Sequence, residues 1–331
     1  MERRTFLALG GATLASVWPV VARAQQKLPR IGYLLTGSPA SAEGHVSLDS
    51  FKQGMRELGY IDGQNIQIEV RAANSDIERF PVLANELINL KVDVIVASNS
   101  LAARAVKQAS ANIPTVVPVM GDPIGDGLVA SLARPGGNIT GLTFLGPQLV
   151  PKRLALLKEA LPNASRIVAL WHPGAYSEQT MSEMIDETKA AAKTLGVNLR
   201  LIPVRHPDEL AATFSIITGE PVDAVVALPS PMLFNQRTRV VGLLTQHRLP
   251  SMSVDRTFVT IGGLLSYGAD ITDSIRLAAT YVDKILKGAK PVDMPVEQPT
   301  KFEFCINLKT AKDFSVDLPA QVLARADVVI E

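Results

Sequence analysis

The chain has 331 residues, with 33 lysines and arginines against 32 aspartates and glutamates and a formal net charge of +1. These charges are scattered, which argues against the basic stripe of a nucleic-acid surface, so we expect no nucleic-acid partner. The single cysteine, Cys305, cannot form an internal disulfide, so burial of an apolar core must stabilise the fold.

The N-terminus has the composition of an export signal. Arg3 and Arg4 precede a short, moderately apolar run at 7–21, and a small-residue cleavage site ends at Ala24. The run is too short and too rich in Gly, Ser and Thr for a stable membrane span. The Arg-Arg-x-Phe-Leu arrangement resembles a twin-arginine signal, although the residues flanking it differ from the usual ones. We therefore predict cleavage after Ala24 and a periplasmic location.

Cleavage there leaves 331 − 24 = 307 residues, enough for about two domains. Two copies of one pattern fill this length. Four features occur in the same order in each copy: an apolar strand, a helical stretch that ends in Leu-Gly, a strand that begins with Val-Asp, and a strand preceded by Ile-Pro or Leu-Pro. Each feature of the second copy lies 130 to 137 residues after its match in the first. The four matched pairs are 30–35 with 166–171, 58–59 with 195–196, 92–97 with 222–227, and 113–117 with 249–253.

Short apolar strands alternate with longer amphipathic stretches in both copies, which predicts parallel sheets covered on both faces by helices. The first copy has expected strands at 30–36, 65–71, 92–97 and 115–119, and helices at 43–58, 76–90 and 100–110. The second has expected strands at 166–171, 197–204, 222–227 and 250–254, and helices at 178–194, 207–218 and 233–246.

Three further segments read as crossings between the two copies. They are the glycine-flanked stretches 136–144 and 262–268 and the proline-rich stretch 291–299. We therefore expect an α/β protein of two doubly wound lobes joined by a three-segment hinge that can close on a ligand. The expected limits are 28–142 with 268–298 for lobe 1, and 143–267 with 299–331 for lobe 2.

The sequence resembles a known family, the ABC-transporter substrate-binding proteins of type I periplasmic-binding-protein fold. The stretches that carry the resemblance cover nearly the whole chain. They are 24–26, 54–60, Arg134-Pro135-Gly136-Gly137-Asn138-Ile139-Thr140-Gly141 with the preceding 131–133, 265–268, Glu297-Gln298-Pro299-Thr300-Lys301-Phe302 with the preceding 295–296, and 324–327. The resemblance implies an extracytoplasmic receptor that feeds a membrane permease and ATPase. Some related proteins bind aromatic amino acids.

Ligands of open α/β sheets lie beyond the carboxyl ends of the strands. Six loops meet this description and would surround one cleft: 36–39, 98–100, 120–123, 171–174, 229–231 and 254–256. From these loops we take Ser38 and Ser230 as candidate ligand contacts.

The loop Ser98-Asn99-Ser100 is the strongest candidate because it ends a buried strand and begins a helix. A helix N-terminus offers N–H donors and partial positive charge, which suit a carboxylate. One of these residues could instead simply cap the helix.

Asp122 and Asp255 occupy matching places after the fourth strand of each copy, where either could pair with a ligand ammonium. Alternatively, Asp122 caps the next helix and Asp255 pairs with Arg256.

Three further side chains complete the candidate site. Trp171 ends a strand and could stack on an apolar ligand, although a tryptophan in an α/β protein is more often packed in the core. His172 either donates to the ligand or faces solvent. Tyr267 lies on a crossing and either reaches the cleft or packs the hinge.

No catalytic motif is present in the sequence: it has no Gly-x-Ser-x-Gly elbow, no dinucleotide fingerprint, no Walker loop and no His-Glu-x-x-His. Its four histidines and one cysteine are widely spread, so we expect no metal, no cofactor and no enzyme activity.

These features predict a monomeric solute-binding receptor of an ABC importer that captures an amino acid or a related carboxylate, including aromatic ones. An exported sensor of the same fold that signals to a membrane receptor is the alternative. A gene regulator is disfavoured because an export signal stands where a DNA-binding domain would begin.

Overall fold

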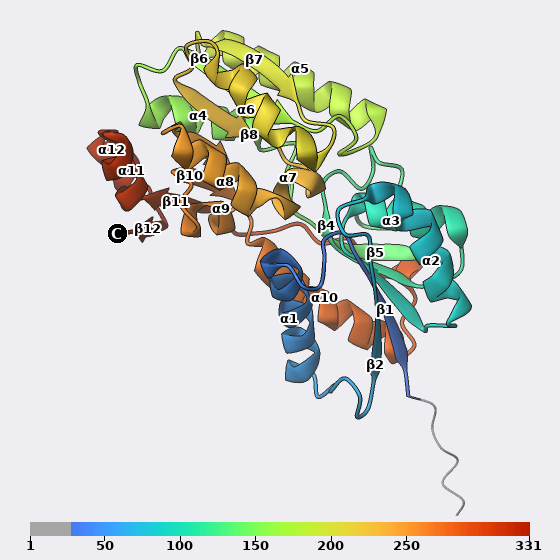
Figure 1. The fold of residues 1–331 in the computed structure, drawn as a ribbon. Coiled ribbons are helices and arrows are strands. Elements are labelled where there is room, and N and C mark those ends of the chain that lie inside the picture. The colour runs from blue at the N-terminus through green and yellow to red at the C-terminus, as the bar shows by residue number, and fades with distance from the viewer. Residues whose placement is uncertain (1–27) are drawn as a thin grey trace, which may run out of the picture.

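The structure is a computed structural model, and it describes residues 28–331. It has two α/β lobes side by side (Figure 1), each built on one sheet. The predicted signal at 1–24 lies outside the described residues. None of the helices within 28–331 combines the length and the apolar character that a membrane span requires.

The sheet of lobe 1 has the strand order β2-β1-β3-β4-β5, and every neighbouring pair is parallel. Its strands are β1 (Arg30–Leu35), β2 (Gln67–Ala72), β3 (Val94–Ala97), β4 (Thr115–Met120) and β5 (Ile139–Thr143). Its helices are α1 (Ala42–Glu57), α2 (Phe80–Asn89), α3 (Ser100–Ala109) and, from much later in the chain, α10 (Ile271–Leu286).

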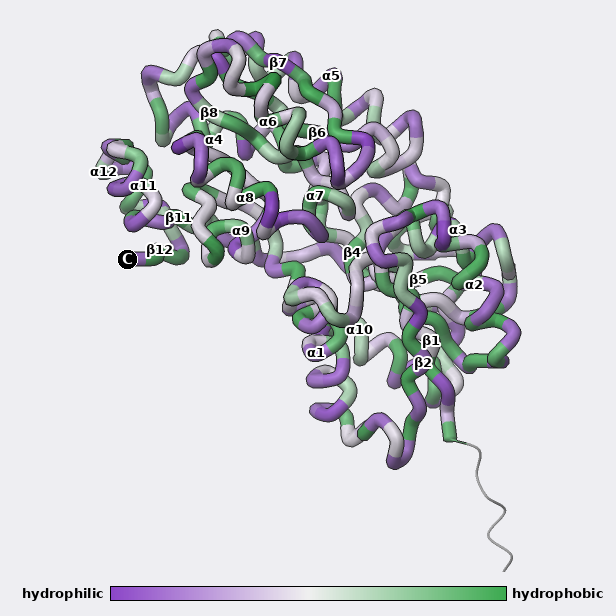
Figure 2. The backbone as a smooth tube through the Cα atoms, in the orientation of Figure 1, coloured by the Kyte–Doolittle hydropathy of each residue, from purple (hydrophilic) through white to green (hydrophobic). Residues whose placement is uncertain are grey.

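Both faces of this sheet are covered. Because successive side chains of a strand point to opposite faces, Tyr33 joins the apolar cluster under α1 and α10, whereas Leu34 joins the one under α2 and α3. In Figure 2 the strands are largely green, and the helices alternate between green and purple along their length. This is the pattern of buried strands beneath amphipathic helices.

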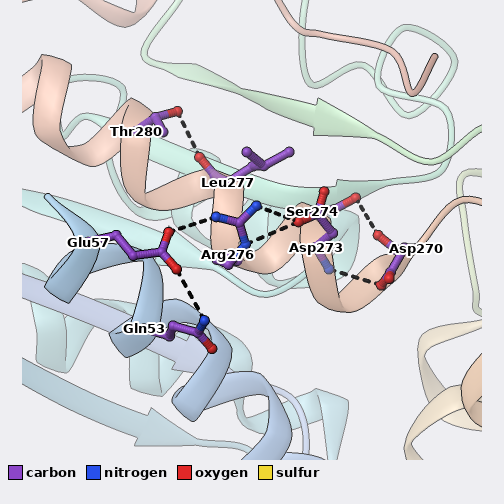
Figure 3. Close-up of polar contacts among 8 residues, drawn as sticks. All are labelled: Gln53, Glu57, Asp270, Asp273, Ser274, Arg276, Leu277 and Thr280. Atoms are coloured by element: carbon purple, nitrogen blue, oxygen red, sulfur yellow. Dashed lines mark hydrogen bonds and ion pairs between the residues drawn. The ribbon is translucent and has the colours of Figure 1, made fainter. Parts of the chain in front are cut away.

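Helix α10 packs against α1, so it belongs to lobe 1 although it follows most of lobe 2 in sequence. The two helix backbones approach closely at Gly54, where a Cβ atom would lie 2.2 Å from the carbonyl oxygen of Arg276. Arg276 then reaches across to Glu57 at 2.7 Å, and the helix begins at its N-cap, Asp270 (Figure 3). A larger residue at position 54 would push the helices apart.

The sheet of lobe 2 has the order β12-β11-β10-β9-β8-β6-β7. Its strands are β6 (Arg166–Trp171), β7 (Asn198–Pro203), β8 (Ala224–Ala227), β9 (Ser251–Ser253), β10 (Leu265–Gly268), β11 (Glu303–Asn307) and β12 (Val328–Ile330). Its helices are α4 (Val150–Ala160), α5 (Glu178–Thr194), α6 (Leu210–Thr218), α7 (Pro231–Asn235), α8 (Arg237–Gln246), α9 (Arg256–Thr260), α11 (Leu308–Phe314) and α12 (Ala320–Leu323). Short 3₁₀ turns lie at Ile77–Arg79, Pro207–Glu209 and Pro291–Asp293.

The predicted two-lobed α/β fold is confirmed, with one difference in detail. β10 and β11 pair antiparallel, whereas the sequence pattern predicts parallel sheets throughout. The reason is the path of the chain: β11 returns to lobe 2 from a crossing rather than through a helix packed on that sheet. A crossover helix is what parallel neighbours normally need.

The chain passes between the sheets three times. It leaves β5 for α4, leaves β10 for α10, and returns from the bridge between Leu142 and Glu297 to β11. The buried side chain of Arg153, on α4, joins two of these passages. Its guanidinium donates to the carbonyl oxygens of Gly146 and Tyr267, each at 2.7 Å.

Candidate functional site

A pocket lies between the two lobes at the carboxyl ends of the strands. It encloses about 660 Å³ of space not filled by atoms, part of it open to solvent. Five of the six predicted loops contribute to its wall, and the loop after β6 contributes slightly further on, through Tyr176. The lining residues are Tyr33, Leu35, Thr36, Ser47, Ser98, Asn99, Ser100, Val119, Gly121, Phe144, Tyr176, Pro229, Ser230, Pro231, Phe234, Asn235, Val254, Ile271 and Ile275.

The start of α3 forms the most ordered polar part of this wall. Asn99 is the N-cap: its side-chain oxygen accepts from the backbone N–H groups of Leu101 and Ala102 at 3.0 and 3.2 Å. Its Nδ2 donates to the Thr36 hydroxyl at 2.5 Å, and that hydroxyl lies 2.9 Å from the Ser98 hydroxyl. Asn99 therefore both caps α3 and lines the pocket, and these hydrogen bonds hold its side chain in one orientation.

Three buried hydroxyls on the wall have no hydrogen-bond partner among residues 28–331. They belong to Tyr33 and Ser100 of lobe 1, which are 0% and 1% exposed, and to Tyr176 of lobe 2, which is 5% exposed. Burial raises the pKa of both tyrosines, so both keep their protons and can donate. A buried hydroxyl without a partner costs about 1–3 kcal/mol. These three groups are therefore the ones a bound molecule would satisfy.

The remaining wall is mostly apolar. Its large side chains are Leu35, Val119, Phe144, Phe234, Val254, Ile271 and Ile275. Phe234 is held in place by the edge of the Phe258 ring, at 6.2 Å between centroids, and by the Arg237 guanidinium over its face at 4.5 Å. The pocket thus offers an apolar body and a polar end, which is the usual make-up of a small-molecule site.

Polar contacts join the lobes on both sides of the pocket. On one side, the N-terminus of α5 meets the loop after β4. Ser177 N–H donates to Asp126 at 2.7 Å, the Ser177 hydroxyl donates to the Gly125 carbonyl at 2.9 Å, and Thr180 donates to Asp122 at 3.0 Å. On the other side, Thr238 donates to Glu43 at 2.7 Å. We call the contacts of Ser177 and Thr180 with the loop 121–127 the α5 latch.

Four of the ten predicted ligand contacts line the pocket: Ser98, Asn99, Ser100 and Ser230. Ser230 also caps α7 by accepting from the N–H of Leu233 at 3.2 Å. Ligand contact by these four residues stays a prediction.

The two aspartates predicted to receive an ammonium lie off the wall. Asp122 accepts from the N–H of Gly125 at 2.9 Å and takes part in the α5 latch. Asp255 caps α9 through the N–H of Thr257 at 3.1 Å, and Arg256 pairs with Glu303 rather than with it. Burial raises the pKa of Asp255 to about 6.

The other four predicted residues also lie off the pocket wall. Ser38 lines a separate groove that shares Asn235 with the pocket, and its hydroxyl accepts from Ala40 N–H at 3.3 Å. Trp171 packs on the apolar cluster of lobe 2. His172 is buried rather than solvent-facing, with Nδ1 2.9 Å from the carbonyl oxygen of Val204. Tyr267 stacks on Phe302, 6.1 Å between centroids, beside the hinge.

Comparison with known proteins identifies the family of this fold. The family model for the ABC transporter substrate binding protein matches residues 44–330. The chain belongs to this family. Members of the family bind substrates and are not enzymes.

Two relatives with known ligands resemble the chain over most of its length. It is 26% identical to a tyrosine-binding protein of Clostridioides difficile over 273 residues, which is 81% of this chain and 77% of that protein. It is 28% identical to an ABC domain from Streptococcus pneumoniae solved in complex with L-Trp, with a TM-score of 0.81 and coverage of 92% of this chain and 100% of that one. A conserved domain protein of Vibrio cholerae, 24% identical, shares the fold with a TM-score of 0.82 and coverage of 92% and 100%.

Proposed function

We propose that this chain is the extracytoplasmic receptor of an ABC importer and captures a small carboxylate-bearing molecule between its lobes. The class comprises amino acids and related carboxylates with an aromatic or other apolar body. The observation that carries the proposal is the pocket itself, which has a capped helix start and three unsatisfied buried hydroxyls at an apolar cavity shared by both lobes.

The physical basis is complementarity to an anion with an apolar body. The N-terminus of α3 carries a partial positive charge, which favours a carboxylate by about 0.3–1 kcal/mol. The hydroxyls of Ser100 and the two tyrosines can each donate to carboxylate oxygens. The two relatives named for tyrosine and solved with L-Trp support an amino acid or a close analogue as the cargo.

Binding would act on lobe closure because donors come from both lobes. Tyr33 and Ser100 belong to lobe 1 and Tyr176 to lobe 2, so a ligand that contacts all three stabilises the arrangement in which the lobes meet. A permease that recognises this arrangement would then receive loaded receptors. The export signal predicted at 1–24, with the twin-arginine arrangement, would deliver the chain to the periplasm.

A thermal-shift screen of residues 25–331 tests the ligand class. The panel holds amino acids, monocarboxylates, dicarboxylates and sugars. A ligand present at about 100 times its dissociation constant adds about 2.7 kcal/mol to the free energy of unfolding. We expect a carboxylate with an apolar body to raise the melting temperature most. A response confined to sugars would contradict the proposal.

Uptake in cells lacking the chain separates the transport role from the sensor alternative. We expect uptake of the labelled ligand to be lost without the chain and restored when it is supplied. Unchanged uptake would contradict the importer role.

A further inference from the structure

The pocket wall has no side chain that is charged at neutral pH. Of its lining residues, only Tyr33 and Tyr176 are ionisable, and burial keeps both neutral. No aspartate, glutamate, lysine, arginine or histidine of residues 28–331 lines it. A ligand ammonium would therefore meet hydroxyls, amides and apolar groups, but no carboxylate.

The acids nearest to the wall in sequence each accept at least one hydrogen bond from a neighbouring residue. Asp122, next to Gly121, accepts from Gly125 N–H and Thr180. Asp255, next to Val254, accepts from the N–H and hydroxyl of Thr257 at 3.1 and 2.6 Å.

The third nearby acid, Asp126, accepts from Ser177 N–H. Nearby arginines partly offset the effect of burial on the pKa of two of these acids. Burial raises the pKa of Asp126, and the charge of Arg104 offsets part of that rise. Burial also raises the pKa of Asp255, and the charge of Arg237 offsets part of that rise. Asp126 Oδ2 and Asp255 Oδ2 have no hydrogen-bond partner among residues 28–331, but neither acid lines the pocket wall.

The donors, in contrast, suit an anion. The hydroxyls of Tyr33, Ser100 and Tyr176 are each more than nine-tenths buried; those of the two tyrosines have a proton to give, and that of Ser100 lies toward Asp126. Ser100 is also the first residue of the ten-residue helix α3, at its positive end. Neither ion finds a counter-ion on the wall, but a carboxylate gains charge-assisted hydrogen bonds and the positive end of α3, whereas an ammonium is disfavoured by that end and meets no acid.

We propose that the pocket selects a monocarboxylate without an ammonium group, and prefers it to the amino acid that has the same side chain. This inference rests on the proposed function and narrows its ligand class. The preferred ligands are carboxylates with an aromatic or branched apolar body.

Matched pairs that differ only in the ammonium group test this choice. Isothermal titration of residues 25–331 compares 3-phenylpropanoate with L-phenylalanine, 3-(4-hydroxyphenyl)propanoate with L-tyrosine, and 4-methylpentanoate with L-leucine. We expect the deaminated member of the best-binding pair to bind at least about tenfold tighter, a difference of about 1.4 kcal/mol. Equal or tighter binding of the amino acid overturns the inference and leaves the proposed receptor function intact. If no member of any pair binds, the carboxylate class itself is overturned.

A charge placed on the wall provides a second test. Asn235 lines the pocket, and Asn235→Asp adds a carboxylate there with almost no change of shape. We expect this variant to bind the deaminated acid more weakly. The ratio of its affinities for the deaminated acid and the matching amino acid should fall or reverse. The control is Asn163→Asp, which makes the same change at an exposed residue off the wall. An unchanged preference in Asn235→Asp would overturn the inference.

Discussion

Arg153 Nε donates a 2.7 Å hydrogen bond to the main-chain carbonyl oxygen of Tyr267. Its Nη1 donates to the carbonyl oxygen of Gly146, also at 2.7 Å. Gly146 lies on the passage between β5 and α4, and Tyr267 lies in β10 just before the passage to α10. One fully buried guanidinium therefore fixes the spacing of two hinge segments, and its burial lowers its pKa to about 10, which still leaves it charged.

Replacing this guanidinium should destabilise the whole chain. Arg153→Met keeps the apolar stem but leaves two buried carbonyl oxygens unsatisfied, each costing about 1–3 kcal/mol. We expect the free energy of unfolding, measured by chemical denaturation, to fall by about 2–5 kcal/mol. Lys152→Met, at the exposed neighbouring position, is the control and should change it by less than about 0.5 kcal/mol. Equal effects in the two variants would show that Arg153 does not hold the hinge.

The α5 latch should influence affinity without touching the ligand. Thr180→Val removes the hydroxyl that donates to Asp122 at 3.0 Å and keeps the shape of the side chain. The loss of one such bond, about 0.5–1.5 kcal/mol, should weaken binding roughly two- to twelvefold in isothermal titration because the arrangement with joined lobes becomes less stable.

Thr188→Val on the same helix provides the matched control. Its hydroxyl bonds within α5, to the carbonyl oxygen of Met184 at 2.6 Å. We expect a stability change there but unchanged affinity. If Thr180→Val binds as tightly as the original chain, the latch has no part in ligand capture.

Asn99 offers a way to separate capping from binding. In Asn99→Asp the new carboxylate can still cap α3, because Asn and Asp are about equally good N-caps. The added negative charge lies on the pocket wall, so binding of a carboxylate should weaken at least about tenfold while the free energy of unfolding changes by less than about 1 kcal/mol. Titration calorimetry and denaturation measure the two effects. Unchanged affinity would place the ligand carboxylate away from α3.

Asp255 predicts a pH dependence of stability. Burial raises its pKa to about 6, above the value of about 3.9 for an unfolded chain. Between about pH 4 and pH 6 the folded state keeps a proton that the unfolded state has lost, so this group makes stability fall as pH rises through that range. Above about pH 6 its contribution is constant.

Comparison with Asp255→Asn isolates this effect, because asparagine can cap α9 equally well but does not titrate. The stability of the variant relative to the original chain should rise from pH 4 to pH 6 and then level off. Asp126 titrates in both proteins and cancels in the difference. A difference that is flat across this range would contradict the raised pKa.

The alternation of apolar strands and amphipathic helices was enough to predict most elements to within a residue or two. The helix predicted at 178–194 is α5, and the strand predicted at 166–171 is β6. Helix α4 was missed, although its apolar residues Val150, Leu154 and Leu157 have helical spacing. The glycine-flanked stretch 136–144 just before it indicates a crossing, which obscures the helical spacing that follows. Burial of Arg153 could not be predicted, since arginine is rarely fully buried.

The site was only partly accessible from the sequence. Asn99 and Ser100 were found because they join a buried strand to a helix start. Tyr33 could not be predicted as a site residue, because a tyrosine within an apolar strand is typical of a core position. Only the structure shows that its hydroxyl lacks a hydrogen-bond partner. Tyr176 reaches the pocket from two residues beyond the predicted loop 171–174, and no sequence signal marks it. Asp122 and Asp255 follow strands, as a ligand contact would, but their carboxylates accept hydrogen bonds from nearby backbone N–H groups and lie off the pocket wall.

Filling the pocket tests the central claim most directly. Val119 is half-buried on the pocket wall, so Val119→Phe places an aromatic ring in the space assigned to the ligand. Val82→Phe, at a position 64% exposed on α2, is the matched control. Titration with the three acid and amino-acid pairs should show binding to the original chain and to Val82→Phe, and its loss in a folded Val119→Phe. Binding of equal affinity to all three proteins would contradict a ligand site between the lobes.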